Sequence, residues 1–185
     1  MIGEAGVVSA ARAVFPGLEP EILSRAELRP EAPFEGLLFR LLGELTAGDV
    51  VGLVVPGAWR GPAASGGSVA LPPPALAVRD HVNLALRGPL TGRWPAGAPR
   101  SFPCMTGIYQ PAVVRAFGGA PVYSDDVVVA GAGDVLRLSP FERQAFNEAG
   151  LEAYADCLVP AVVAAAFYGL KVAACIVPQA AHERE

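Results

Sequence analysis

The chain has 185 residues, which is enough for one domain with a sizeable core. Hydrophobic residues make up 52% and charged residues 17%, and 21 glycines and 18 prolines interrupt the apolar runs; this composition argues against a disordered chain and favours buried strands joined by short loops. The net charge of −4, with no stripe of Lys or Arg, argues against a nucleic-acid partner.

In the first half of the chain, apolar patterns predict three strands and two helices. Residues 6–14, GVVSAARAV, suggest a strand that turns into a helix, and residues 33–45 place leucines and phenylalanines at helical spacing. The run VVGLVVP, residues 50–56, is typical of a buried strand. A Gly/Pro/Ser-rich loop is expected over residues 57–74, and residues 75–78 then form a strand that leads into RDHVNL.

The middle of the chain is predicted to be loop, short helix and strand. Residues 85–110 have the composition of a loop. Residues 111–117, PAVVRAF, predict a short helix that ends at the two glycines that follow it. Residues 127–133, VVVAGAG, predict a strand followed by a glycine turn, which is consistent either with turn geometry or with a phosphate-binding loop.

The stretch SPFERQAFNEAG carries a complete helix pattern. Ser139 is the expected N-cap, Pro140 the first helical residue, Glu142 the partner in a capping box, and Gly150 the stop. A capping box is sufficient reason for Glu142 at this place, so the pattern gives no support to a catalytic carboxylate. A short strand is expected next, at EAYAD.

Residues 158–178 are apolar over the length of a membrane span, but Gly169 and Lys171 interrupt them. The sequence instead favours a helix followed by a buried strand, and no membrane partner. With strands and helices alternating from residue 127 onward, we predict a single α/β domain over residues 1–185, with a mostly parallel central sheet flanked by helices. Residues 179–185 are expected to form a flexible tail.

Histidines and cysteines give no metal pattern. His81 and His182 are the only histidines, and neither forms an HxxxH or Cys/His pair, so we expect no zinc and no cofactor. The three cysteines, Cys104, Cys157 and Cys175, have no CxxC spacing and predict free thiols in a reducing, cytoplasmic compartment. The first residues lack the basic region of a signal peptide.

Several segments together resemble the trimeric purine nucleoside phosphorylase and methylthioadenosine phosphorylase family. RDHVNLALRGPL is similar to the family patterns DHINL and LRGP, FPCMTGIYQP to FPxMSxAYD, and residues 139–172 to TPAExRxLxxLGADxVGMSTVPExxxARxxGLxV without a gap. The resemblance implies a nucleoside-phosphorylase-like α/β fold, a homotrimer, and a nucleoside, purine base or phosphate as ligand. It also implies that Phe102 corresponds to the phenylalanine that reaches into a neighbouring subunit's pocket.

The same comparison shows departures where the family binds phosphate. Ser9 is the only remnant of the first phosphate serine, whose glycine loop is missing, and the family's RFHxYEGY segment has no counterpart. The second phosphate serine falls on Cys157 and the methionine beside it on Asp156. Arg60 and Arg137 could supply substitute donors.

The family's purine-binding and loop positions are also changed. The base-binding glutamate falls on Leu138, and the base-binding asparagine falls near Gln179 or Ala180. The family's double-alanine glycine loop is replaced by PGAWRG, which contains Trp59 and Arg60.

Three functions are compatible with this pattern. The first is a non-catalytic paralogue or small-molecule binder that has lost most phosphate- and base-binding residues, since each lost oxyanion-type donor typically costs about 10²–10³ in rate. The second is an active nucleoside phosphorylase or hydrolase with relocated residues, in which Asp156, Cys157, Arg60, Arg137 and Gln179 converge on one cavity. The third is a structural or interaction protein.

The polar motif RDHVNL is interpreted as structural. The resemblance to the family implies that Asp80, His81 and Asn83 form a hydrogen-bonded joint at a strand end, and the need of buried polar groups for partners is sufficient reason to find them together. In the neighbouring segment, Phe102, Met105 and Tyr109 form an aromatic and sulfur cluster that favours a core or interface over a ligand contact.

Overall fold

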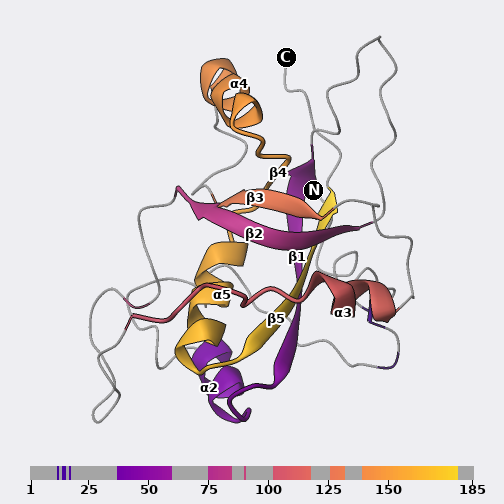
Figure 1. Ribbon diagram of the computed structural model, residues 1–185, viewed down its shortest axis with the longest axis vertical. Helices are drawn as coiled ribbons and strands as arrows, with labels where there is room; N and C mark the ends of the chain where they lie inside the picture. Colours follow the sequence, from indigo (N-terminus) through magenta and orange to yellow (C-terminus); the bar gives the residue numbers. More distant parts are fainter. Residues whose placement is uncertain are drawn as a thin grey trace.

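The computed structural model describes residues 12, 14, 15, 17, 37–59, 75–84, 90, 102–117, 126–131 and 139–178. Within these residues the chain alternates strands and helices (Figure 1). The elements are α2 (Leu37–Gly43), β1 (Val50–Trp59), β2 (Leu76–Asn83), α3 (Pro111–Ala116), β3 (Val127–Gly131), α4 (Pro140–Glu148), β4 (Ala153–Tyr154), α5 (Leu158–Phe167) and β5 (Lys171–Pro178).

The five strands form a closed barrel in the order β1-β4-β3-β2-β5. β1 pairs with β5 in parallel over eight residue pairs, and β2–β3 and β3–β4 are also parallel. The barrel is closed by two short antiparallel contacts, β1 with β4 and β2 with β5, each of two residue pairs. The α/β class is therefore confirmed, but the predicted mostly parallel sheet is in fact a mixed sheet that curls on itself.

β5 explains why the apolar run over residues 171–178 has no polar alternation. Val172, Ala174 and Ile176 face the main core, where they meet α2 and α5, while Ala173 and Cys175 face a second core cluster with Phe15 and α3. Both faces of the strand are therefore buried, and each position is apolar. Figure 1 shows α2 and α5 at one side of β1 and β5 and α3 at the other.

The predicted helix and strand over residues 158–178 are confirmed as α5 and β5, and Gly169 separates them with φ of +73°. No helix among the described residues is long and apolar enough to cross a membrane. Residues 179–185 lie outside the described residues, as does most of the element predicted at residues 6–14.

α4 has the N-terminus that the sequence predicts. The Ser139 hydroxyl accepts the Glu142 backbone N–H at 3.2 Å, and the Glu142 carboxylate accepts the Ser139 backbone N–H at 2.8 Å. Gly150 follows the helix with φ of +77°, a conformation that favours glycine. Hydrogen bonds to the Glu142 carboxyl from the Ser139 backbone N–H and from the Ser139 side chain lower the pKa of Glu142.

Two loop predictions need correction. The predicted strand at residues 75–78 continues as β2 through the polar residues to Asn83, and β1 extends beyond its predicted end to Trp59. The predicted joint of Asp80, His81 and Asn83 is also wrong in part. The Asp80 carboxylate accepts the His81 backbone N–H at 2.8 Å, as the joint requires, but Asp80 and Asn83 are exposed. Among the described residues, only the half-buried His81 side chain of these three bonds to a distant residue. β2 continues through these residues because β3 pairs with it from Val78 to Asn83.

Candidate functional site

The three parallel strands β2, β3 and β4 end together at one edge of the barrel. Asn83 pairs with Gly131, and Ala130 pairs with Tyr154, so the last residues of the three strands lie in register. Ligands of parallel α/β sheets commonly bind outside the carboxyl ends of the strands. This carboxyl edge, defined by Asn83, Gly131 and Tyr154, is therefore the candidate site.

Two of the residues predicted for the site lie at this edge. Asp156 and Cys157 lie one residue beyond the end of β4, after Ala155, and Cys157 is the N-cap residue of α5. Both are half-buried. The Cys157 side chain makes no capping hydrogen bond to the α5 backbone. Asp156 thus stands next to the N-cap of α5, where the helix N-terminus carries a partial positive charge.

Two glycines allow the edge to pack tightly. A Cβ on Gly131 at the end of β3 would overlap Val159 Cγ2 in the first turn of α5. A Cβ on Gly57 in β1 would overlap the Tyr154 carbonyl oxygen and lie 2.7 Å from Ile176 Cγ2. The turn from β4 into α5 is therefore held between β3 and β1, with no room for a side chain at either glycine.

The other predicted site residues are not gathered at this edge by the described structure. Phe102 lies in the segment before α3 with 94% of its surface exposed, so it makes little contact with its own chain. Ser9, Arg60 and Gln179 lie outside the described residues, as do Arg137, Leu138 and the glycine turn after Gly131.

A second polar centre, not anticipated from the sequence, joins β2 to the segment that carries Phe102. The Tyr109 hydroxyl and His81 Nδ1 lie 2.8 Å apart and share a hydrogen bond, and their rings pack edge to face. Burial lowers the pKa of His81 and exceeds the opposing effect of the Asp80 carboxylate. Burial, with a smaller contribution from Asp80, raises the pKa of Tyr109 well above its ordinary value.

No local sequence pattern pairs these two residues, because they are 28 positions apart. The structure also divides the predicted aromatic cluster into two parts. Tyr109 is buried and Met105 packs against the main core, whereas Phe102 points into solvent.

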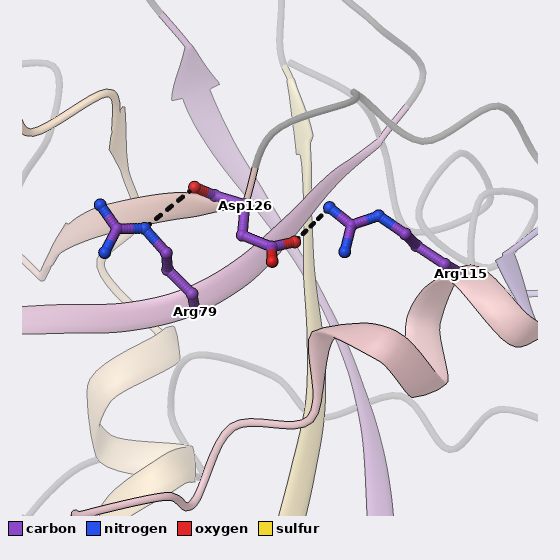
Figure 2. Close-up of polar contacts among 3 residues, drawn as sticks. All are labelled: Arg79, Arg115 and Asp126. Atoms are coloured by element: carbon purple, nitrogen blue, oxygen red, sulfur yellow. Dashed lines mark hydrogen bonds and ion pairs between the residues drawn. The ribbon is translucent and has the colours of Figure 1, made fainter.

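Arginines flank Asp126, the residue before β3, on both sides (Figure 2). Arg115 of α3 forms an ion pair with the Asp126 carboxylate, and Arg79 Nε donates to the Asp126 carbonyl oxygen at 3.1 Å. These contacts tie α3 and β2 to the start of β3. All three side chains are at least partly exposed, so the ion pair itself contributes little stability.

The thiols differ strongly in environment. Cys104 is exposed, and hydrogen bonds from Thr106 lower its pKa, while burial raises the pKa of Cys175 to about 12. Within the described part of the chain, no three His, Cys, Asp or Glu side chains are grouped closely enough to hold a metal ion.

Comparison with known proteins gives a structural likeness only. No family model matches the sequence, and no curated protein matches it. A Schistosoma mansoni purine nucleoside phosphorylase solved with a monocyclic inhibitor superposes with a TM-score of 0.54 at 19% identity, over 76% of this chain and 52% of that one. A Schistosoma purine nucleoside phosphorylase solved with guanosine gives 0.53 and 19%, over 70% and 48%.

The fold of the chain is therefore like that of nucleoside phosphorylases. The chain spans about half the length of these two enzymes. At 19% identity the likeness shows the fold and leaves the activity to be tested.

Proposed function

We propose that this chain is a nucleoside-phosphorylase-like binding protein that takes a nucleoside or purine base and does not catalyse phosphorolysis. The observation that supports it is the carboxyl edge of a phosphorylase-like fold, where Asp156 and Cys157 immediately precede α5. In the family resemblance, Cys157 occupies the place of a phosphate serine and Asp156 that of a methionine. A thiol is a weaker hydrogen-bond donor than a hydroxyl.

The charge at this edge also disfavours phosphate. A helix N-terminus attracts anions with roughly half an elementary charge, whereas the Asp156 carboxylate carries a full negative charge beside it. Two unit charges about 4 Å apart repel by about 4 kcal/mol at an effective dielectric constant of 20. Asp156 is half-buried, so solvent reduces this figure, but the sign remains. An uncharged nucleoside or base avoids the repulsion.

Measurements of ligand binding and of turnover distinguish the proposed binding protein from an active enzyme. We expect calorimetry with inosine, adenosine, methylthioadenosine and hypoxanthine to detect at least one ligand, and chromatography to detect no free base released from the nucleosides when phosphate is present. The double variant Asp156→Asn/Cys157→Ser should bind inorganic phosphate at least about tenfold more tightly than the wild type, because it removes the carboxylate and restores a hydroxyl. Robust turnover by the wild type would refute the proposal.

The active-enzyme alternative requires Arg60, Arg137 or Gln179 to supply the missing donors. In that case the alanine variant of the responsible residue should have a kcat about 10²–10³-fold lower than that of the wild type. Turnover that all three alanine variants retain would argue against relocated donors at these positions.

Self-association is a further part of the proposal. Phe102 is 94% exposed, and a phenylalanine this exposed leaves apolar surface in water that a partner could cover. We propose that Phe102 is buried between subunits of a homotrimer. Light scattering after size exclusion should give a trimer for the wild type and smaller species for Phe102→Ala. A wild-type monomer would refute this assembly and leave the ligand proposal in place.

An assembly module without a ligand is the second candidate, and a second exposed phenylalanine favours it. Phe141, in the first turn of α4, is 79% exposed. If the chain serves only assembly, Phe102→Ala and Phe141→Ala should both reduce its association, and none of the nucleosides or bases should bind. Ligand binding by the wild type would contradict that candidate.

A further inference from the structure

The segment from Phe102 to Gln110 is attached to the barrel from two directions. On one side, Tyr109 forms a bridge with Val172 of β5, where the Gln110 N–H donates to the Val172 carbonyl at 2.8 Å and the Val172 N–H donates to the Ile108 carbonyl at 2.9 Å. On the other side, the Tyr109 hydroxyl meets His81 of β2. The segment therefore spans a gap between two strands that pair with each other only at Leu76 and Ala77 of β2.

The turn inside the segment is fixed as well. Gly107 has φ of +67°, and its carbonyl accepts hydrogen bonds from Gln110 Nε2 and from Lys171 Nζ, both at 3.1 Å. Ile108 and Tyr109 are buried, whereas Phe102 at the other end of the segment is almost fully exposed. Ile108 and Tyr109 thus anchor the segment to the barrel, while Phe102, seven positions before Tyr109, is exposed.

A β-bulge aims His81 at this anchor. Val78 pairs with Val127 but Asp80 pairs with Val128, so Arg79 is an extra residue in β2. Leu76 and Val78 belong to the main core, and simple alternation would next turn Asp80 toward it. The bulge shifts the alternation by one residue, and His81, opposite Val129, faces Tyr109 instead.

We propose that His81 is a positioning residue: through its hydrogen bond to Tyr109 it fixes the 102–110 segment on the barrel, and it does so best when neutral, because a charged ring is disfavoured in a half-buried site. The proposal goes beyond ligand binding and does not depend on it. Neutral imidazole accepts the Tyr109 hydroxyl proton at Nδ1, or donates from Nδ1 in the other tautomer. In the protonated ring Nδ1 can only donate, so the bond to the Tyr109 oxygen can persist, but protonation places a charge in a half-buried site and therefore favours release of His81 and the attached segment into solvent.

The groups around His81 make it the titrating member of the pair. Asp80 on the same strand favours the charged imidazole, but burial outweighs it. The neighbouring residues of β3, Val128, Val129 and Ala130, carry no titratable group, and neither does α5 from Leu158 to Phe167. Lys171 of β5 donates to the Gly107 carbonyl of the same segment. Tyr109 stays protonated at neutral pH, because the ordinary pKa of a tyrosine, about 10, is already well above 7 and burial raises the pKa of Tyr109 further.

Backbone amide exchange measures the attachment directly. The reporters are the N–H groups of Gln110 and Val172, which join the segment to β5, and the reference is the N–H of Ala149, which donates to the Ala145 carbonyl at the end of α4. At pH 7.5, Tyr109→Phe and His81→Ala should raise the exchange rates of the reporters relative to the reference by about twofold to tenfold. His81→Asn, which keeps an acceptor atom on Cγ, should restore the wild-type ratio.

A pH series distinguishes positioning from a general loss of stability. In the wild type, relative protection of the reporters should fall between pH 7.5 and pH 5.5, and it should stay constant in His81→Asn. His182→Gln, which removes the other histidine, should behave as the wild type. The proposal is overturned if reporters and reference change equally in Tyr109→Phe, or if the pH dependence persists in His81→Asn.

Discussion

The contact between the end of β3 and the start of α5 predicts a specific cost for adding one methyl group to Gly131. A Cβ there would overlap Val159 Cγ2 and lie 3.1 Å from Val159 Cβ. Val159 is fully buried, so it cannot move aside without disturbing the core. Overpacking of this kind costs about 1–3 kcal/mol. Because about 1 kcal/mol changes the Tm of a chain of this size by about 2–4 °C, Gly131→Ala should lower Tm by about 2–12 °C.

A double-mutant cycle tests whether Val159 is the cause. Val159→Ala alone should destabilise by about 1.6 kcal/mol or more, since about 0.8 kcal/mol is lost for each buried carbon removed. The Gly131→Ala methyl group then occupies part of the vacated space, so the double variant should lose less than the sum, by about 0.5–3 kcal/mol. Urea unfolding gives all four free energies.

The matched control is Gly43, whose added Cβ would meet the Tyr168 hydroxyl oxygen at an ordinary 3.5 Å. Gly43→Ala should not destabilise, and helix propensity favours it by up to about 1 kcal/mol. Equal effects at Gly43 and Gly131, or a strictly additive cycle, would refute the steric explanation.

Three further measurements follow from other contacts. Ser139→Ala should destabilise α4 by about 0.5–2 kcal/mol while Ser139→Asp should not, because Asp keeps the capping acceptor; amide exchange at Glu142 reports the difference. Glu142 has a lowered pKa in the folded chain, so its contribution to stability is present above its ordinary pKa and is lost as the pH falls through the folded value; the wild type should lose more stability on acidification than Glu142→Gln, and equal losses would contradict this. Iodoacetamide at pH 7.5 should alkylate Cys104 and spare Cys175 in the folded chain, as peptide mass spectrometry will show, and equal labelling would contradict the assigned burial.

Local patterns were the reliable part of the sequence. Ser139, Glu142 and Gly150 specify the ends of α4 through hydrogen bonds and a backbone conformation that involve near neighbours only. The apolar run that became β5 is similarly local, because a strand buried on both faces needs no polar residue along its length. The run that became β1 does form a strand, but the prediction that this strand is buried was wrong: only Val55 in it is buried, and Val50 is 47% exposed. Such features require no knowledge of the remainder of the chain.

The closure of the barrel, unlike these elements, could not be predicted from local sequence patterns. It depends on two antiparallel contacts, Trp59 and Ala58 with β4 and Leu76 and Ala77 with β5, which join residues far apart in sequence. A two-residue pairing leaves no periodic pattern in either strand. The alternation of a predicted strand therefore could not distinguish an open parallel sheet from a closed mixed one.

The candidate site was predictable only in part. Asp156 and Cys157 could be placed at a strand end, because a short strand and a helix flank them in sequence. Three of the predicted ligand residues, Ser9, Arg60 and Gln179, lie outside the described residues and stay predictions. The pairing of His81 with Tyr109 was missed, since nothing in either segment specifies its partner.

The bulge at Arg79 shows why the polar motif was misread. With Leu76 and Val78 directed inward, strict alternation assigns Asp80 to the core and His81 to solvent, which would require a buried carboxylate. One extra residue reverses this assignment: Asp80 becomes exposed and His81 meets Tyr109. The Arg79 side chain, bonded to the Asp126 carbonyl, ties the extra residue to the start of β3 (Figure 2). The motif is thus polar because the bulge changes which side chains face the core. The charged side chains of Arg79 and Asp80 lie in solvent, and the His81 imidazole lies beside the buried Tyr109.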